Sequence, residues 1–367
     1  MIITQRFYPC AATVVLLFAA TGATVFCEGI TFTEQAVKLH TIIRERFIDG
    51  DTNLVRTRLG NGDPLEDCSL YGGFYLACLV DAFDVSRDEV LREEALDIFE
   101  GLYANATVSG IPGFITRGRS SDGSFRGDPS VDQYTGVIYG FWRYFHSPLS
   151  GERERTLIRG CLADMLVRFE KNGWRITRVN GEMTTWGRLH SESPTRAERL
   201  LSFLLAGYDI TGDGRWLEAY REKLPRLLEH CVNFDGLQSW VLIQSQVSLR
   251  MLISLETDKN VRAVYIKGSR NLARECLPQV EGFRRVPEAG SPEDELKRFY
   301  DESPVFTETI RIPIEAVTVM LLTGDEEFRR DAVSALGEIN GHLDPGRVTL
   351  NVAVVPWEWN QWLAMKK

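Results

Sequence analysis

The sequence predicts an all-α protein in which six inner helices are surrounded by six outer helices, an (α/α)6 toroid. Three observations lead to this prediction. Strand patterns are almost absent, two kinds of helical segment alternate along the chain, and the connections between them alternate between short and long. One kind of segment is amphipathic and the other is apolar nearly all round. Because a helix without a polar face must be buried on all sides, the apolar segments are expected to form the inner ring.

The outer helices are expected where apolar residues recur on one helical face. In SRDEVLREEALDIFEGLY, residues 86–103, apolar side chains share one face and charges occupy the other. Ser86 and Glu89 fit a capping box at the start of this segment. The same pattern predicts outer helices near 33–48, 86–104, 151–171, 214–230, 257–277 and 325–339.

The inner helices are expected where charge is scarce. SLYGGFYLACLVDAF (69–83) has no charge before Asp81, and VDQYTGVIYGFW (131–142) carries only Asp132. Gly136 and Gly140 lie four residues apart, a spacing that lets another helix approach closely. Inner helices are predicted near 69–83, 130–145, 196–210, 238–255, 304–322 and 357–365.

The connections predict where a functional site lies. Links from an inner to an outer helix are short, whereas most links in the other direction are long: 49–68, 105–129, 172–195, 278–303 and 340–356. In a toroid all the long links lie on one rim, at the N-terminal ends of the inner helices. Long loops in compact domains are usually functional. We therefore expect the site on this rim of a single domain, residues 28–367.

The N-terminus predicts export. MIITQRFYPC carries one arginine and no acid, and the chain then stays uncharged from Ala11 to Phe26, with small residues that offer cleavage points before Glu28. Residues 1–27 are therefore interpreted as a signal peptide, which implies a periplasmic or extracellular protein. The uncharged run is short for a membrane span of roughly 20 residues, although an uncleaved anchor is the alternative. No later segment is expected to span a membrane.

Composition restricts the kind of partner. The chain has 367 residues, 44% of them hydrophobic, and a net charge of −9 without a basic stripe, so no nucleic-acid partner is expected. No metal-ligand spacing and no nucleotide-binding motif is found, so no cofactor is expected. Nothing in the sequence indicates an oligomeric state. The cysteines beyond the signal segment are expected to be buried thiols: Cys68, Cys78, Cys161, Cys231 and Cys276.

Four stretches resemble the six-hairpin glycosidase superfamily of (α/α)6 toroids. They are SLYGGFYLACL (69–79), DPSVDQYTGVIYGFW (128–142), TTWGRL (184–189) and TRAERLLSFLLAGYDITGD (195–213). The resemblance implies a carbohydrate-active protein, since members include glycoside hydrolases, unsaturated-uronyl hydrolases and, on related toroids, polysaccharide lyases. The preferred expectation is hydrolysis of an oligosaccharide or polysaccharide that contains uronic acid.

RGDPSVDQYTG, residues 126–136, holds the candidate catalytic pair. Asp128 precedes a proline at the start of an inner helix, as an N-cap does. Asp132 follows four residues later and would share a helical face with Asp128. The helix dipole would favour a charged Asp132, whereas burial and repulsion from Asp128 would raise its pKa. Glycoside hydrolysis needs a protonated carboxyl group. We therefore expect Asp132 to be the general acid and Asp128 to position it or a water molecule; the alternative is a carboxylate that only binds ligand.

The remaining site candidates are predicted to bind substrate. Gln133 and Tyr134 belong to the same rim, and Tyr134 would stack on a sugar, act as a base in a lyase, or belong to the core. Arg117 and Arg119, with Arg126, would hold the carboxylate of an acidic sugar or remain solvated.

Four further positions complete this set, and they lie in other segments. Trp186 would stack on a sugar, and His190 would move a proton if the enzyme is a lyase. Tyr71 would line the sugar site. Glu358 would be the second carboxylate of an inverting reaction, or PWEW would close the ring by packing. The alternatives to hydrolysis are a polysaccharide lyase that uses Tyr134 or His190 and a carbohydrate-binding toroid without catalysis.

Overall fold

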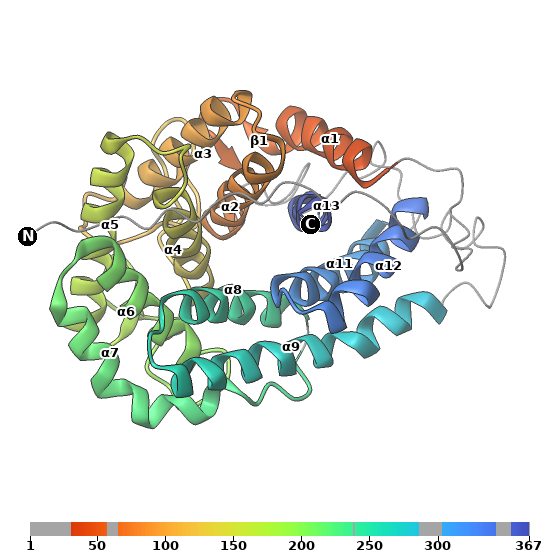
Figure 1. Ribbon diagram of the computed structural model, residues 1–367. Coiled ribbons are helices and arrows are strands. Elements are labelled where there is room, and N and C mark those ends of the chain that lie inside the picture. Colours follow the sequence, from red (N-terminus) through yellow and green to blue (C-terminus); the bar gives the residue numbers. More distant parts are fainter. Residues whose placement is uncertain (1–30, 57–64, 238, 286–302, 343–353, 367) are drawn as a thin grey trace, which may run out of the picture.

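The computed structural model describes residues 31–56, 65–237, 239–285, 303–342 and 354–366. The predicted signal peptide lies outside these residues. Twelve α-helices of the described part form two concentric layers (Figure 1). The inner helices are α2 (Cys68–Ser86), α4 (Val131–Phe145), α6 (Ala197–Thr211), α8 (Ser239–Leu255), α11 (Ser303–Leu322) and α13 (Val354–Met365). The outer helices are α1 (Phe32–Ile42), α3 (Val90–Thr107), α5 (Glu152–Lys171), α7 (Gly214–Leu227), α9 (Lys259–Arg285) and α12 (Glu326–His342).

The predicted alternation of inner and outer helices is confirmed, and the ring is closed. Neighbouring inner helices contact one another from α2 through α4, α6, α8 and α11 to α13, and α13 contacts α2. A π-helical turn, Ile43–Phe47, continues α1, and a 3-10 turn, Leu228–Cys231, continues α7. The chain therefore folds as an (α/α)6 toroid.

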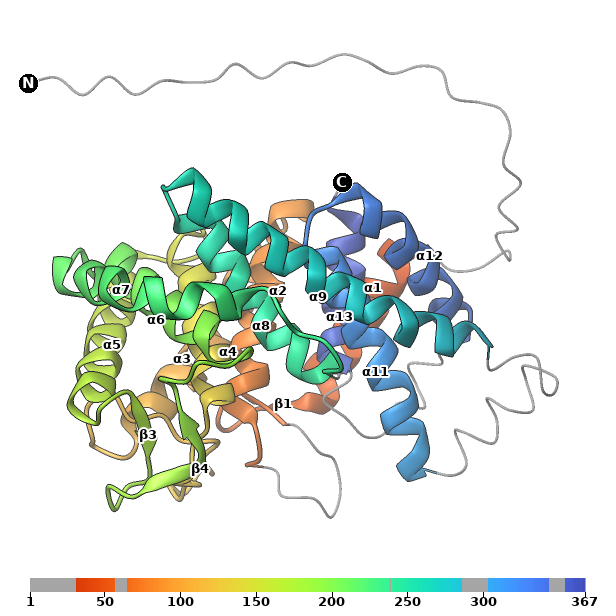
Figure 2. The ribbon, with the colours of Figure 1, turned by 90° about the horizontal axis from the view of Figure 1, so that it is seen from below.

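Two short hairpins interrupt the long connections and were not predicted. β1 (Ile48–Asp49) pairs with β2 (Leu54–Val55), and β3 (Arg175–Thr177) pairs with β4 (Met183–Arg188), both antiparallel. Figure 2 shows β3 and β4 projecting from one end of the toroid, opposite the C-terminus. This end is the long-loop rim, where the inner helices begin. The other end, where they finish, is the short-turn rim.

Glycines set the closest approach in the inner ring. A Cβ at Gly136 would lie 2.3 Å from the carbonyl oxygen of Leu70, and one at Gly140 would lie 2.4 Å from that of Gly73. A Cβ at Gly73 would in turn lie 2.0 Å from the carbonyl oxygen of Gly136. Contacts this short are with backbone atoms, which cannot move aside. The predicted packing role of Gly136 and Gly140 is therefore confirmed, with α2 as the partner.

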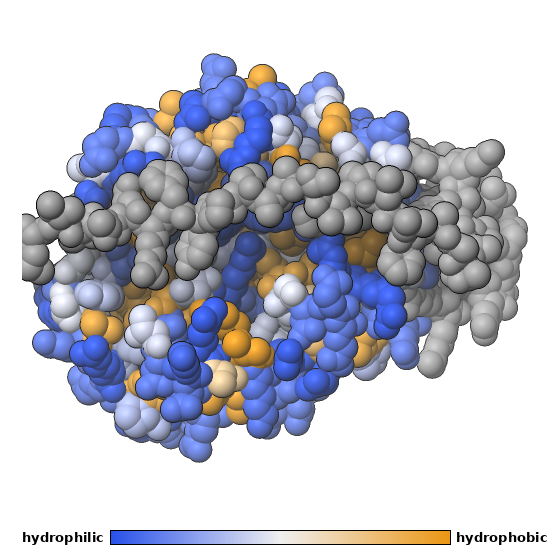
Figure 3. Space-filling view, in the orientation of Figure 1, coloured by the Kyte–Doolittle hydropathy of each residue, from blue (hydrophilic) through white to orange (hydrophobic). Residues whose placement is uncertain are grey.

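Aromatic side chains fill the centre of the toroid at mid-height. The centroid of Trp359 on α13 lies 5.4 Å from that of Phe74 on α2 and 5.9 Å from that of Tyr139 on α4. We call these three side chains the aromatic floor. Toward the short-turn rim, Trp359 donates a hydrogen bond to Asp81, which also pairs with Arg143 at 2.6 Å. In Figure 3, hydrophilic residues predominate around the edge of this face, and hydrophobic residues are visible nearer its middle. The central axis is thus occupied below the long-loop rim.

The capping box predicted at Ser86 and Glu89 is wrong. Ser86 is the last residue of α2, because the helix continues until Arg87 adopts a left-handed φ of 58°. The Oδ1 atom of Asp88 accepts a hydrogen bond from the N–H of Val90 instead, at 3.0 Å. Glu89, the residue directly before α3, makes no side-chain capping bond, so Asp88 supplies the side-chain acceptor at the start of this helix.

The buried thiols are confirmed, since all five described cysteines are buried and free. Contrary to expectation, α2 is long and apolar enough to cross a membrane by length and composition. Of its most apolar window, 89% is buried inside the toroid. A core position thus accounts for its apolar sequence.

Candidate active site at the long-loop rim

The first turn of α4 differs from the prediction in its cap. Ser130, not Asp128, is the N-cap: its Oγ accepts a hydrogen bond from the N–H of Asp132 at 3.3 Å. The Oε1 atom of Gln133 accepts from the N–H and the Oγ of Ser130, at 2.6 and 2.7 Å. This is a capping box, which the S-x-x-Q spacing favours over an aspartate before proline. Gln133 is fully buried, so its role here is to fix the helix start.

Asp132 lies at the long-loop rim, in the first turn of α4. It precedes Tyr139 of the aromatic floor by seven residues on α4, which places both on one helical face. The Asp132 side chain is 29% exposed, and its Oδ1 accepts a hydrogen bond from Nη1 of Arg199 on α6 at 2.7 Å. A partly exposed carboxylate therefore stands above the floor at the rim.

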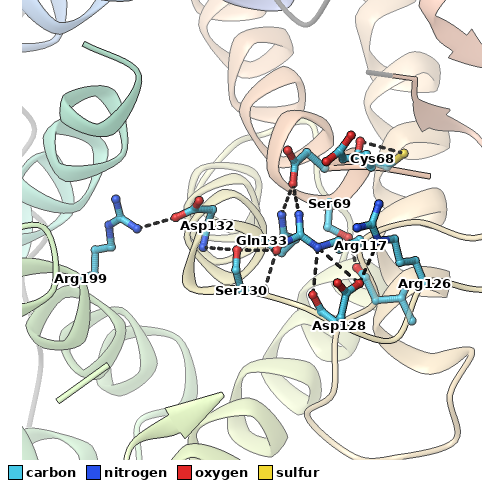
Figure 4. A network of polar contacts seen from close by, with 12 residues as sticks. Cys68, Ser69, Arg117, Arg126, Asp128, Ser130, Asp132, Gln133 and Arg199 are labelled. Atoms are coloured by element: carbon cyan, nitrogen blue, oxygen red, sulfur yellow. Dashed lines mark hydrogen bonds and ion pairs between the residues drawn. The ribbon is translucent and has the colours of Figure 1, made fainter. Parts of the chain in front are cut away.

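Asp128 does not join Asp132. Its Oδ1 accepts from Nε of Arg126 at 2.9 Å, and its carbonyl oxygen accepts from Nε of Arg117 at 2.9 Å. Figure 4 shows Asp132 directed toward Arg199, and Asp128 directed toward Arg117 and Arg126 on the other side of Gln133. The predicted pairing of the two carboxylates on one helical face is wrong, because Asp128 precedes the helix.

Asp67 supplies a second carboxylate to the same rim. Its Oδ1 accepts from Nη1 of Arg117 at 2.5 Å and from Nε2 of Gln133, the residue after Asp132. The Asp67 side chain is 32% exposed. Asp67 immediately precedes α2 and has a left-handed φ of 57°. Such a conformation outside glycine costs about 1–3 kcal/mol and is concentrated at functional sites.

The first turn of α6 adds three charged residues that the prediction missed: Arg196, Glu198 and Arg199. Glu198 is fully buried, accepts a hydrogen bond from Oγ of Ser245 at 2.6 Å, and has its pKa raised by burial. Thr195, before them, has a φ of 69°, which is strained for a β-branched residue. The available signal was the charge in TRAERLL, at the start of an otherwise apolar inner helix.

Buried polar atoms without a partner concentrate at this turn. Among the described residues, nothing hydrogen-bonds to Nη1 of Arg196, Oε2 of Glu198, Nε of Arg199 or Oε1 of Gln244 on the neighbouring α8. Buried polar groups in folded proteins nearly always have partners, so such a group needs an explanation. A bound polar ligand at this end of the toroid would supply the missing partners.

Tyr134 belongs to the core. It is fully buried, its hydroxyl donates to the carbonyl oxygen of Gly113 at 3.1 Å, and it accepts from the N–H of Ile115 at 3.2 Å. Burial raises the pKa of Tyr134 to about 12. Its hydroxyl fastens the loop before α4 to the helix, so of the three predicted roles the core role fits the geometry.

The two arginines predicted to hold a sugar carboxylate have intramolecular partners instead. Arg117 joins Asp67 to the backbone of Asp128. Nη2 of Arg119 donates to the carbonyl oxygen of Thr52 at 3.1 Å, which ties this loop to the β1–β2 turn. Both side chains therefore organise the rim.

Glu358 lies between the two helical layers rather than at the rim. It is fully buried, bonds to Nδ1 of His40 on α1, and accepts from Nε1 of Trp362 at 2.9 Å. This geometry favours the ring-closing role of PWEW, because α13 must seal against α1. Tyr71 is buried as well, at 5% exposure, with its centroid 6.2 Å from that of Phe74 in the floor.

Comparison with protein-family models finds no match, and neither does comparison with curated protein sequences. Solved structures do match. A sugar epimerase from a ruminal bacterium has a TM-score of 0.53 at 12% identity, over 83% of this chain and 86% of its own. An unsaturated glucuronyl hydrolase specific for heparin gives 0.53 at 12%, over 91% and 95%. The alpha-1,6-mannanase from Salegentibacter sp. HEL1_6 gives 0.51 at 10%, over 92% and 99%.

The chain has the six-hairpin (α/α)6 toroid fold. The predicted resemblance is confirmed at the level of architecture. The three structural neighbours are named for different reactions, epimerisation and hydrolysis among them. The fold alone therefore does not select a reaction for this six-hairpin toroid.

Exposed tryptophans lie at the long-loop rim of this six-hairpin toroid. Trp186 on β4 is 63% exposed, and Trp240 in the first turn of α8, which the prediction missed, is 40% exposed. His190 follows β4 and is exposed; partial burial and the charges of Lys223 and Arg226 lower its pKa. No group of three or more His, Cys, Asp or Glu residues in the described part could hold a metal ion.

Proposed function

We propose that the protein is a carbohydrate-active enzyme that hydrolyses glycosidic bonds in oligosaccharides at the long-loop rim. One observation carries the proposal. Two partly exposed carboxylates, Asp67 and Asp132, stand at the starts of neighbouring inner helices, above an aromatic floor. Glycoside hydrolysis uses such a pair of carboxyl groups.

The two carboxylates differ in their donors, which suggests their roles. Asp67 accepts hydrogen bonds from Arg117 and Gln133, and two donors stabilise the anion that would activate water. Asp132 has one side-chain donor, Arg199, and is assigned as the proton donor to the leaving oxygen. The water adds to the anomeric carbon, its proton passes to Asp67, and the glycosidic bond breaks as Asp132 gives up its proton. Trp186 and Trp240 would stack on the sugar units on either side.

The test uses the purified protein and a panel of neutral and uronate-containing oligosaccharides. New reducing ends and the ultraviolet absorbance of a 4,5-unsaturated uronate are recorded together. Hydrolysis predicts reducing ends without new absorbance, and a fall in kcat of about 10²–10⁴-fold for Asp132→Asn and for Asp67→Asn. Asp164→Asn, on the exposed face of outer helix α5, is the matched control and should leave kcat unchanged.

The same experiment decides the role of Asp128 and the choice of reaction. If Asp128→Asn lowers kcat as far as Asp132→Asn while Asp67→Asn does not, Asp128 is the second carboxylate. Rising absorbance that His190→Asn abolishes would mean elimination by a lyase. Sugar binding without turnover, unaffected by Asp132→Asn, would mean a binding toroid. Altered sugar composition with intact bonds would mean isomerisation. Elimination, binding without turnover and isomerisation would each exclude hydrolysis.

A further inference from the structure

Two arginines beside Asp132 have N–H groups that make no hydrogen bond within the described residues. Arg199 is 2% exposed and donates through Nη1 to Asp132, while its Nε is buried without a partner among the described residues. Nη1 of Arg196, three residues earlier, is in the same situation. Leaving a buried donor without a hydrogen-bond partner is unfavourable, and more so when the group is charged. These N–H groups therefore indicate a missing acceptor.

The charge at this turn indicates that the acceptor is anionic. Arg196 and Arg199 bring two guanidinium groups beside the carboxyl group of Asp132. The other nearby acid, Glu198, is fully buried, and burial favours its neutral form. A guanidinium group matches the two oxygens of a carboxylate in a fork of parallel hydrogen bonds.

Backbone strain at the same place supports a built site. Thr195 holds a φ of 69°, and Arg196 follows it as the N-cap of α6, without a side-chain capping bond. A β-branched residue in this region costs free energy that the surrounding structure must offset. The strained turn carries the Arg196 side chain into the protein beside the charges of Arg199, Asp132 and Glu198.

We propose that the sugar bound beside Asp132 is anionic, and that Arg196 and Arg199 hold its carboxylate. This inference rests on the proposed carbohydrate activity and narrows its substrate to uronate-containing saccharides. It gives Arg196 and Arg199 the carboxylate-binding role that the sequence analysis gave to Arg117 and Arg119. Arg117 pairs with Asp67, and Arg119 donates to the backbone of Thr52. Arg196 is a binding residue here, while Arg199 also positions Asp132.

The experiment compares one uronate-containing oligosaccharide with its carboxyl-reduced form, in which each carboxylate is a hydroxymethyl group and every linkage is unchanged. Affinity is measured by calorimetric titration and turnover by new reducing ends. We expect the acidic form to bind at least about tenfold more tightly, because a hydrogen bond to a charged group contributes about 1.5–3 kcal/mol. The ratio of the two affinities is independent of the fraction of protein that is folded.

Three variants test whether Arg196 binds the carboxylate: Arg196→Gln, Arg196→Lys and the control Arg262→Gln. Arg196→Gln should bring the ratio close to one, and Arg196→Lys should retain part of it, because lysine keeps the charge but lacks the fork. Arg262→Gln, with the same charge change on the exposed outer helix α9, should keep the full ratio.

Equal binding of the two oligosaccharides by the unmodified protein would overturn the inference, as would an unchanged ratio in Arg196→Gln. If the neutral form is hydrolysed as well as the acidic form, the proposed hydrolysis stands and only the anionic preference falls. If neither form is bound or hydrolysed across the panel, both proposals fall.

Discussion

The carboxylates at the long-loop rim differ in their surroundings. Asp67 has two donors, Asp132 has one, and Glu198 combines a single hydroxyl donor with complete burial. Donors favour the charged form of a carboxylate and burial favours the neutral form. The rim therefore offers two partly exposed carboxylates with different hydrogen-bond donors, and a buried acid behind them.

Trp186 gives a residue-scale prediction for substrate binding. Its indole is 63% exposed on β4, so Trp186→Ala should leave the free energy of unfolding within about 0.5 kcal/mol of the original. Loss of one stacking surface, worth about 0.5–1.5 kcal/mol, should raise KM about 2- to 13-fold with kcat unchanged. Steady-state kinetics with Trp186→Tyr as control check this, since tyrosine keeps a ring. An unchanged KM in Trp186→Ala would show that Trp186 does not contribute to sugar binding.

At the scale of elements, the contact between α2 and α4 positions the carboxylates. Asp67 precedes α2, Asp132 lies in the first turn of α4, and the glycines between these helices bring their backbones together. Gln133 then reaches Asp67 directly. The helix contact thus brings the starts of α2 and α4 to one part of the rim, where both carboxylates lie.

Glycine substitutions test this contact. Gly140→Ala should destabilise the protein by about 1–3 kcal/mol, since its Cβ would lie 2.4 Å from a carbonyl oxygen of α2. Gly160→Ala is the matched control on outer helix α5, where nothing lies within 4 Å of the added Cβ. It should stabilise the protein by about 0.5–1 kcal/mol, because alanine favours the helix. Denaturant unfolding measures both; equal effects of the two substitutions would contradict the close approach.

At the scale of the whole molecule, buried charges close the toroid between its first and last hairpins. His40 on α1 bonds through Nδ1 to Glu358 on α13 and through Nε2 to Glu94 on α3 at 2.9 Å. Tyr75 donates to Glu94, and Nε of Arg44 lies 3.5 Å from it. Burial alone would lower the pKa of His40, but the two carboxylates outweigh it and raise the pKa to about 10.

This closure should make stability depend on pH. Because the pKa of His40 is higher in the folded than in the unfolded state, where it is about 6.5, its contribution is complete below pH 6.5 and is lost as pH rises through about 10. His40→Gln should cost about 3–5 kcal/mol near pH 6, since Glu358 would lose its buried cationic partner.

Thermal unfolding between pH 6 and 10.5 checks the prediction by comparing the unmodified protein with His40→Gln. The comparison cancels groups that titrate in both proteins, so the difference in stability should shrink as pH rises. A difference that stays constant across this range would show that His40 is not charged in the folded protein.

The sequence by itself determined the order and layer of the helices, the rim that carries the long links, and the glycine contact. Each of these features follows from the periodicity of residues that are close together in the chain. Only the tertiary structure separated Asp128 from Asp132, placed Tyr134 and Glu358 in the interior, and brought Arg196, Glu198 and Arg199 beside Asp132. Those relations depend on contacts between residues far apart in the chain, and one sequence carries no measure of such distances. A charged residue in an apolar helix indicates that a polar partner exists, but the sequence pattern does not identify that partner.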